Sequence, residues 1–183
     1  MSNLAKQKIR IPKNITVKII NNELQLKGPL GSLEIPLKVK VFIEENNIIV
    51  SSKLISGDIQ ADGLLESKAL QGTFISLIKQ SFTGLISGFR KRLNLVGVGY
   101  KAQLIKNILE LKIGYSHVCG VKVPSTLKIF CPKPTSISIF GINKQEVNNF
   151  AAFIRSYKVP EPYKGKGILY QDEKIILKEG KRS

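Results

Sequence analysis

The sequence predicts an α+β protein made of two copies of one unit. Apolar and polar residues alternate over short stretches, as they do in half-buried strands. The series of alternating stretches occurs twice in the same order along the 183 residues, which indicates a duplication. Each series is followed by a segment whose apolar residues recur at helical spacing, and such a helix covers one face of a sheet. We therefore expect two tandem domains, each an antiparallel sheet covered on one face by a helix.

The first copy contains four strand-like stretches. Residues 23–28, Glu-Leu-Gln-Leu-Lys-Gly, alternate and end in the turn Gly28-Pro29-Leu30-Gly31. The alternation resumes at Leu33 and Ile35 and continues through residues 39–43 and 48–50. These stretches predict hairpin-connected strands with one apolar face.

The second copy repeats this order at a nearly constant offset. Residues 109–114, Leu-Glu-Leu-Lys-Ile-Gly, repeat the first strand and its glycine. Residues 121–124 match residues 33–36 in pattern, and the alternating stretches 127–129 and 137–139 follow. The ordered series predicts that Leu24 and Leu26 are buried at the positions that Leu109 and Leu111 occupy in the second copy.

One helix is expected to close each copy. In the second copy, Asn143 followed by Glu146 fits an N-cap with a capping-box partner. An apolar stripe follows, and Pro160 and Pro162 come after it. Its residues are Val147, Phe150, Ala151 and Ile154. In the first copy the residues 56–58, Ser-Gly-Asp, precede the helical segment, and we expect Gly84 to break it. The apolar residues of that segment are Leu65, Ala69, Leu70, Phe74, Leu77 and Ile78.

The charge is large, positive and unevenly divided between the copies. The chain has 29 Lys and Arg against 13 Asp and Glu, a net charge of +16. Residues 1–82 hold 11 basic and 7 acidic side chains, a net charge of +4, and residues 83–183 hold 18 and 6, a net charge of +12. We place the first domain at residues 1–82 and the second at residues 83–183. The second domain, with its basic C-terminal tail, is the expected contact for a polyanion.

Several classes of protein do not fit the sequence. No apolar run is long enough to span a membrane, and the N-terminus has neither an apolar signal region nor a presequence, so we expect the protein to work where it is made. Cys119 and Cys131 lack the spacing of a disulfide framework or a zinc site, and His117 is the only histidine. We therefore expect no enzyme, no metal site and no catalytic residues.

A glycine motif at residues 97–102 does not indicate a cofactor site, although it looks like one. It matches the dinucleotide-binding pattern GxGxxA, but strand-like alternation follows the glycines, where dinucleotide binding requires a helix. We expect no cofactor.

The segment 160–170, Pro-Glu-Pro-Tyr-Lys-Gly-Lys-Gly-Ile-Leu-Tyr, is the strongest candidate for a binding site. Gly165 and Gly167 lack the β-carbon that keeps a ligand away from the backbone, and Lys164 and Lys166 supply cations. Backbone N–H groups exposed by the glycines suit phosphate oxygens, and Tyr163 offers a ring for stacking. The same segment also fits an ordinary basic turn between a helix and a strand.

A family resemblance favours the first interpretation. Several ordered blocks resemble the L6 family of large-subunit ribosomal proteins of the bacterial type, and the resemblance covers nearly the whole chain. The blocks are residues 96–102, 109–111, 114–117, 141–145, 151–155, 160–168 and 178–181.

The resemblance implies a structural constituent of the large ribosomal subunit. Its second domain would dock on large-subunit rRNA near the sarcin–ricin loop and the base of the stalk, beside neighbouring ribosomal proteins and the site where translational GTPases bind. From the basic clusters and the family blocks, the residues expected to bind rRNA are Arg90, Lys91, Arg92, His117, Arg155, Lys158, Tyr163, Lys164, Gly165, Lys166, Gly167, Lys174, Lys178, Lys181 and Arg182.

Two questions remain open from the sequence. Lysine outnumbers arginine 24 to 5, which indicates an A/T-rich coding bias and favours an organelle-encoded protein of a mitochondrion or plastid over a bacterial one. The alternative to a permanent constituent is an RNA-binding assembly factor that visits the ribosome transiently.

Overall fold

A computed structural model of the chain describes residues 8–54 and 63–179. Within these ranges, side chains are described except those of residues 52–54 and 63–68. The chain divides into two compact units, Met1–Gly88 and Phe89–Ser183. The boundary placed between residues 82 and 83 falls inside helix α1 (Gly63–Ile86). The division follows that helix, at Gly88.

The first unit contains α1 and strands in two antiparallel sheets, ordered β2-β3-β4 and β1-β6-β5. Helix α1 packs on strands of both sheets, chiefly on β6 and β3. The strands are β1 (Ile9–Arg10), β2 (Thr16–Ile20), β3 (Glu23–Gly28), β4 (Gly31–Pro36), β5 (Val39–Glu44) and β6 (Asn47–Leu54).

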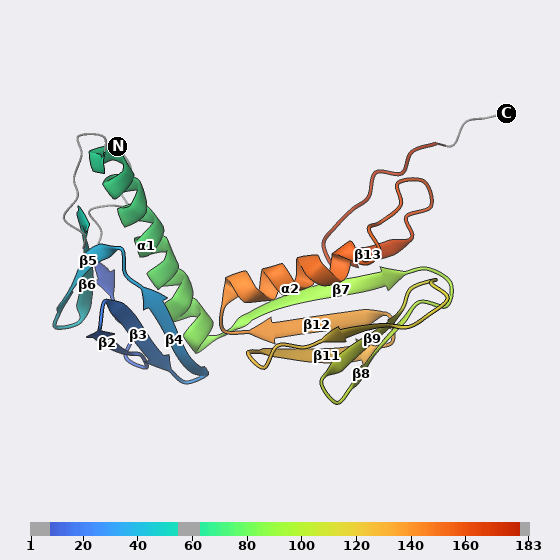
Figure 1. Cartoon of the computed structure of the whole chain (residues 1–183), viewed down its shortest axis with the longest axis horizontal. Helices are drawn as coiled ribbons and strands as arrows, with labels where there is room; N and C mark the ends of the chain where they lie inside the picture. The colour runs from blue at the N-terminus through green and yellow to red at the C-terminus, as the bar shows by residue number, and fades with distance from the viewer. Residues whose placement is uncertain (1–7, 55–62, 180–183) are drawn as a thin grey trace. The chain divides into compact units, whose positions relative to one another are not determined.

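The second unit repeats this order of elements and adds one strand. Its antiparallel sheets are ordered β10-β9-β8 and β11-β12-β7-β13, and α2 (Lys144–Ser156) packs on β7, β12 and β13 (Figure 1). The strands are β7 (Phe89–Val96), β8 (Lys101–Ile105), β9 (Ile108–Lys112), β10 (Cys119–Lys122), β11 (Leu127–Lys133), β12 (Ser136–Gly141) and β13 (Gly167–Tyr170).

The strand registers of the two units correspond. Leu24 of β3 is paired with Ile19 and Ile35, and Leu109 of β9 with Leu104 and Val121. All four predicted core leucines, Leu24, Leu26, Leu109 and Leu111, are fully buried. The α+β class with two repeated units is therefore confirmed.

Each unit nevertheless holds two small sheets where we expected one. The alternation of apolar and polar residues specifies which side chains point to the core. That requirement is the same for one sheet and for two sheets that share a core, so the pattern could not separate the two cases.

Helix α1 does not break at Gly84. It continues to Ile86, and Gly88, with φ +70°, follows its end. The buried side chains of its last turns, Phe82 and Leu85, extend the apolar face past the point where we ended it. A glycine in a helix costs only about 1 kcal/mol relative to alanine, and burial of two such side chains exceeds that cost.

The other predictions for α1 have mixed outcomes. Phe74 and Ile78 are buried, Leu70 and Leu77 are half-buried, and Ala69 is exposed. Residues 56–58 and the side chain of Leu65 lie outside the part that the structure describes.

Helix α2 begins as the sequence predicts. The Asn143 side-chain oxygen accepts a hydrogen bond from the Gln145 backbone N–H at 3.0 Å. Glu146 accepts from the Asn143 side-chain amide at 3.2 Å, instead of from the backbone N–H of a standard capping box. The predicted stripe is buried, and the helix ends at Ser156, before the two prolines.

Candidate nucleic-acid interface

The segment after α2 forms a closed loop, residues 158–167, which we call the basic loop. The Glu161 N–H donates to the Lys166 carbonyl and the Gly165 N–H donates to the Glu161 carbonyl, both at 2.9 Å. The Ile168 N–H donates to the Lys158 carbonyl at 2.9 Å and closes the loop at its base. Backbone hydrogen bonds thus fix the path of the chain between the lysines.

The glycines have a different role from the one predicted. The Gly165 N–H is used inside the loop, so it is not an exposed donor for phosphate. Gly165 has φ +68°, a conformation that favours glycine, and Gly167 is buried with its α-carbon against Pro160. Both glycines therefore shape the loop, and the lysine side chains carry its positive charge.

The tail, residues 171–179, runs beside the basic loop. The Lys178 N–H donates to the Pro162 carbonyl at 2.9 Å, which joins the two segments. Figure 1 shows both segments extending away from the sheet. Lys164, Lys166, Lys174 and Lys178 are exposed, and Tyr163 is 54% exposed. None of these four lysines forms an ion pair with a carboxylate within the described residues.

The loop that holds His117 lies against the end of α2. The Tyr115 hydroxyl donates to the Tyr157 carbonyl at 2.9 Å, and the Lys158 ammonium lies 4.8 Å from the centre of the Tyr115 ring. The His117 ring stacks on Tyr115 with centroids 6.1 Å apart. His117 and Lys158, far apart in sequence, therefore share one surface. Sequence reasoning missed Tyr115, which joins them.

Arg155 is committed to the fold. Its guanidinium forms an ion pair with Glu173, whose second carboxylate oxygen accepts from the Tyr170 N–H at 3.1 Å. The guanidinium also lies 5.3 Å from the centre of the Tyr170 ring. These contacts hold the start of the tail against α2 and pair the charge of Arg155 with a carboxylate, and its contact with RNA stays a prediction.

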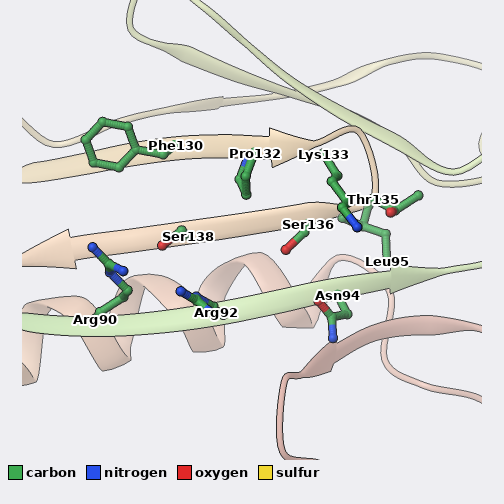
Figure 2. A pocket seen from close by; sticks show the side chains of 10 residues that line it. All are labelled: Arg90, Arg92, Asn94, Leu95, Phe130, Pro132, Lys133, Thr135, Ser136 and Ser138. Atoms are coloured by element: carbon green, nitrogen blue, oxygen red, sulfur yellow. The ribbon is translucent and has the colours of Figure 1, made fainter.

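The side chains of the basic triplet on β7 alternate between the two faces of the strand, although all three residues also line a hollow beside residues 170–173. Lys91 lies over the Tyr170 ring at 5.0 Å. Arg90 and Arg92 point from the opposite face of the strand, where Figure 2 shows them lining a cleft with residues of β11 and β12. Successive side chains of a strand alternate between faces, so adjacent charges are separated. Lys181 and Arg182 lie outside the described residues.

The glycines at residues 97–102 have a packing role. Strand β8 follows them, not a helix, and Gly97 and Gly114 pack on the buried ring of Tyr100. A β-carbon at Gly97 would lie 2.8 Å from that ring. Close packing of backbone on an aromatic ring therefore accounts for Gly97, while Gly99 has φ +74°, a conformation that favours glycine.

The remaining chemistry of the unit is limited. Burial raises the pKa of the Cys131 thiol, which disfavours its reactive thiolate. Among residues 8–54 and 63–179, no group of three or more His, Cys, Asp or Glu side chains is placed to hold a metal ion. None of the helices described is long and apolar enough to cross a membrane.

Comparisons with known proteins identify the family. The family model described as "Ribosomal protein L6" matches residues 96–171. The chain is 43% identical to large ribosomal subunit protein uL6 of Mycoplasmoides gallisepticum, over 99% of this chain and 97% of the relative. It is 41% identical to uL6 of Nitrosospira multiformis, over 100% and 99%. It is 43% identical to uL6m of Reclinomonas americana, over 100% of both chains. These similarities include both units, and the chain belongs to the ribosomal protein L6 family.

Proposed function

We propose that this structural ribosomal protein binds large-subunit rRNA through the basic loop and the tail. One observation carries the proposal: the hydrogen bond between Lys178 and Pro162 joins two segments whose exposed lysines form no ion pair within the described residues. The charge of both segments therefore acts on one partner. Exposed ammonium groups held beside one another attract a phosphate backbone.

The lysines favour recognition of shape over sequence. An ammonium group contacts phosphate as a point charge and does not discriminate bases as a bidentate guanidinium does. Lys158, with Tyr115 and His117, extends the same surface beyond the loop, and Tyr163 offers a ring on which a base can stack. The second unit is thus the main rRNA-binding domain in this proposal.

The location on the subunit follows from the family resemblance. We place the contact near the sarcin–ricin loop and the stalk base, with neighbouring ribosomal proteins and the docking site of translational GTPases close by. Membership in a structural ribosomal family confirms that the chain is not an enzyme. The organellar origin stays a prediction, because bacterial and organellar relatives are equally similar.

The test replaces Lys164 and Lys166 with Glu in the full chain and measures filter binding to a large-subunit rRNA fragment across a salt series. Each phosphate contact that is lost should lower the slope of log affinity against log salt by roughly 0.7 to 0.9. We expect a strong loss of affinity and a flatter salt dependence.

The matched control replaces Lys38 and Lys40 with Glu. Both lysines are exposed and lie in the first unit. The change in net charge is the same as for Lys164 and Lys166, because two lysines are replaced with Glu in each case. We expect a much smaller loss of affinity. Equal losses from the two pairs would show that the basic loop is only a charged turn and would overturn the proposal.

A further inference from the structure

The face of the four-stranded sheet opposite α2 carries a cleft that the basic loop does not reach. Ile137 and Ile139 of β12 point into the core, so Ser136 and Ser138 point to the other face. Ser138 is paired with Arg92 of β7 on one side and with Phe130 of β11 on the other. Figure 2 shows these side chains on one face of the three strands.

The cleft exists because the middle strand carries small side chains. Ser136 and Ser138 form its floor, while Arg90 and Arg92 stand on one side and Phe130 on the other. The cleft is open to solvent and has a volume of about 610 Å³. Two strand spacings separate Arg92 from Phe130, about 10 Å. A nucleotide fits this separation, with its base at the phenyl ring and its phosphate at the guanidinium.

The chemistry of the walls points to an unpaired nucleotide. The Phe130 side chain is 55% exposed, and a solvated phenyl ring on a sheet is a stacking surface for a base. Neither Arg90 nor Arg92 belongs to an ion pair within the described residues, so both guanidiniums are available to phosphate. The serine hydroxyls can donate to or accept from a base edge.

We infer that this cleft binds one unpaired nucleotide of an RNA strand, with its base stacked on Phe130 and its phosphate held by Arg90 and Arg92. The inference rests on the proposed function, because it takes RNA as the partner. It adds a second contact, which selects single-stranded RNA, to the contact of the basic loop with the phosphate backbone.

The first unit contains a built-in comparison. Phe42 of β5 has the position that Phe130 has in β11, and it is 54% exposed. Its cross-strand partner, however, is Ile49 where Phe130 has Ser138. A nearby cation, Lys8, is paired with Glu44 at 3.2 Å. The same ring is thus present without the small floor, and the lysine beside it is paired with a carboxylate.

The experiment uses the absence of tryptophan from the sequence. A Phe130→Trp variant of the full chain gives one fluorophore in the cleft, and a stacked base quenches it. We expect saturable quenching by a single-stranded hexamer of uridines. Adding Arg90→Gln and Arg92→Gln should weaken the binding at least about tenfold. In the otherwise unchanged chain, Phe130→Ala should lower the affinity for a labelled hexamer by about 5-fold to 150-fold.

The control is Phe42→Trp, which places the fluorophore at the equivalent, equally exposed position. We expect no saturable quenching over the same hexamer concentrations. Equal quenching of the two variants would overturn the inference.

The two proposals can fail separately. Lys164→Glu with Lys166→Glu should weaken binding of the rRNA fragment. Added to the Phe130→Trp variant, the same two changes should leave the quenching of its tryptophan largely unchanged. If the two lysine changes weaken binding of the rRNA fragment but the hexamer does not quench the Phe130→Trp variant, the inference about the cleft is wrong and the proposed function stands. If the lysine changes do not weaken binding of the rRNA fragment and the hexamer does not quench the Phe130→Trp variant, both proposals are wrong.

Discussion

Gly167 lies where two stretches of backbone meet. A β-carbon built on it would lie 2.6 Å from the α-carbon of Pro160 and 3.0 Å from the carbonyl oxygen of Lys158. Both neighbours are backbone atoms, which cannot move aside as the end of a flexible side chain can. Its φ of +151° is also a conformation that other residues rarely adopt. The glycine thus allows the basic loop to close against β13.

Replacing Gly167 with Ala should therefore destabilise the second unit. We expect the free energy of unfolding to fall by about 1–3 kcal/mol, because the methyl group forces Pro160 and Lys158 away from the strand. Urea denaturation of the full chain measures the change in midpoint.

The control is Gly72→Ala in helix α1, where a β-carbon meets no atom within 4 Å. Alanine is the better helix former, so this change should raise the free energy of unfolding by about 0.5–1 kcal/mol. A destabilisation as large at Gly72 as at Gly167 would refute the steric explanation.

Helix α2 shows an element whose start is encoded locally. The Asn143 side chain satisfies the Gln145 N–H, one of the donors that a helix leaves unpaired at its N-terminus. The apolar stripe that follows the cap faces β7 and β12. Cap and stripe together fix both the beginning of the helix and the face that it buries.

We expect Asn143→Ala to lower the free energy of unfolding by about 1 kcal/mol, because the cap is lost. Asn148→Ala, at an exposed position inside the same helix, should instead raise it by up to about 0.7 kcal/mol. Thermal denaturation followed by circular dichroism compares the two variants. Equal effects of the two changes would show that the cap contributes nothing.

The elements differ in how far the sequence predicted them. Strands β3 to β6 and β9 to β12, the core leucines and α2 were predicted, because alternation, capping and helical spacing are local patterns, but β1, β2, β7 and β13 were not among the predicted strands. The end of α1 was not, because burial of Phe82 and Leu85 in the fold outweighs the preference of Gly84.

The candidate site was predictable in composition and less so in geometry. The pairing of Arg155 with Glu173 and the contact of Lys158 with Tyr115 join residues distant in sequence, and no local pattern encodes them. The alternation of β7 could have separated Lys91 from Arg90 and Arg92, since a strand places neighbours on opposite faces. The cleft at Phe130 could not be predicted, because its prediction requires the register of the strands, which the sequence pattern does not specify.

On the scale of the whole molecule, the duplicated units have diverged in charge and in their last elements. Both follow the same order of six strands and a helix within the described residues, but only the second continues into the basic loop, β13 and the tail. The added segment, residues 157–183, holds 7 basic and 4 acidic side chains, a net charge of +3, while residues 83–156 hold 11 and 2, a net charge of +9. The repeat thus supplies a shared scaffold, and the addition supplies the proposed contact with RNA.

A permanent constituent and a transient assembly factor differ in occupancy. We expect one copy of the protein for each large subunit in translating ribosomes, because the basic loop and the tail are proposed to hold rRNA in the finished particle. Quantitative mass spectrometry of polysome fractions, compared with free large subunits, measures this ratio. Depletion from polysomes with enrichment on immature subunits would favour the assembly factor.

Strand β13 has a mechanical consequence. The basic loop enters one end of this strand and the tail leaves the other, so both proposed RNA-binding segments are attached to the same four residues, Gly167–Tyr170. The strand is paired with β7 along its length, and Ile168 is fully buried. A force applied along the strand through either segment is shared among these backbone hydrogen bonds. A force that peels the strand from the sheet would instead break them one after another. Tension from a moving RNA helix would thus be transmitted directly into the sheet and the core beneath it.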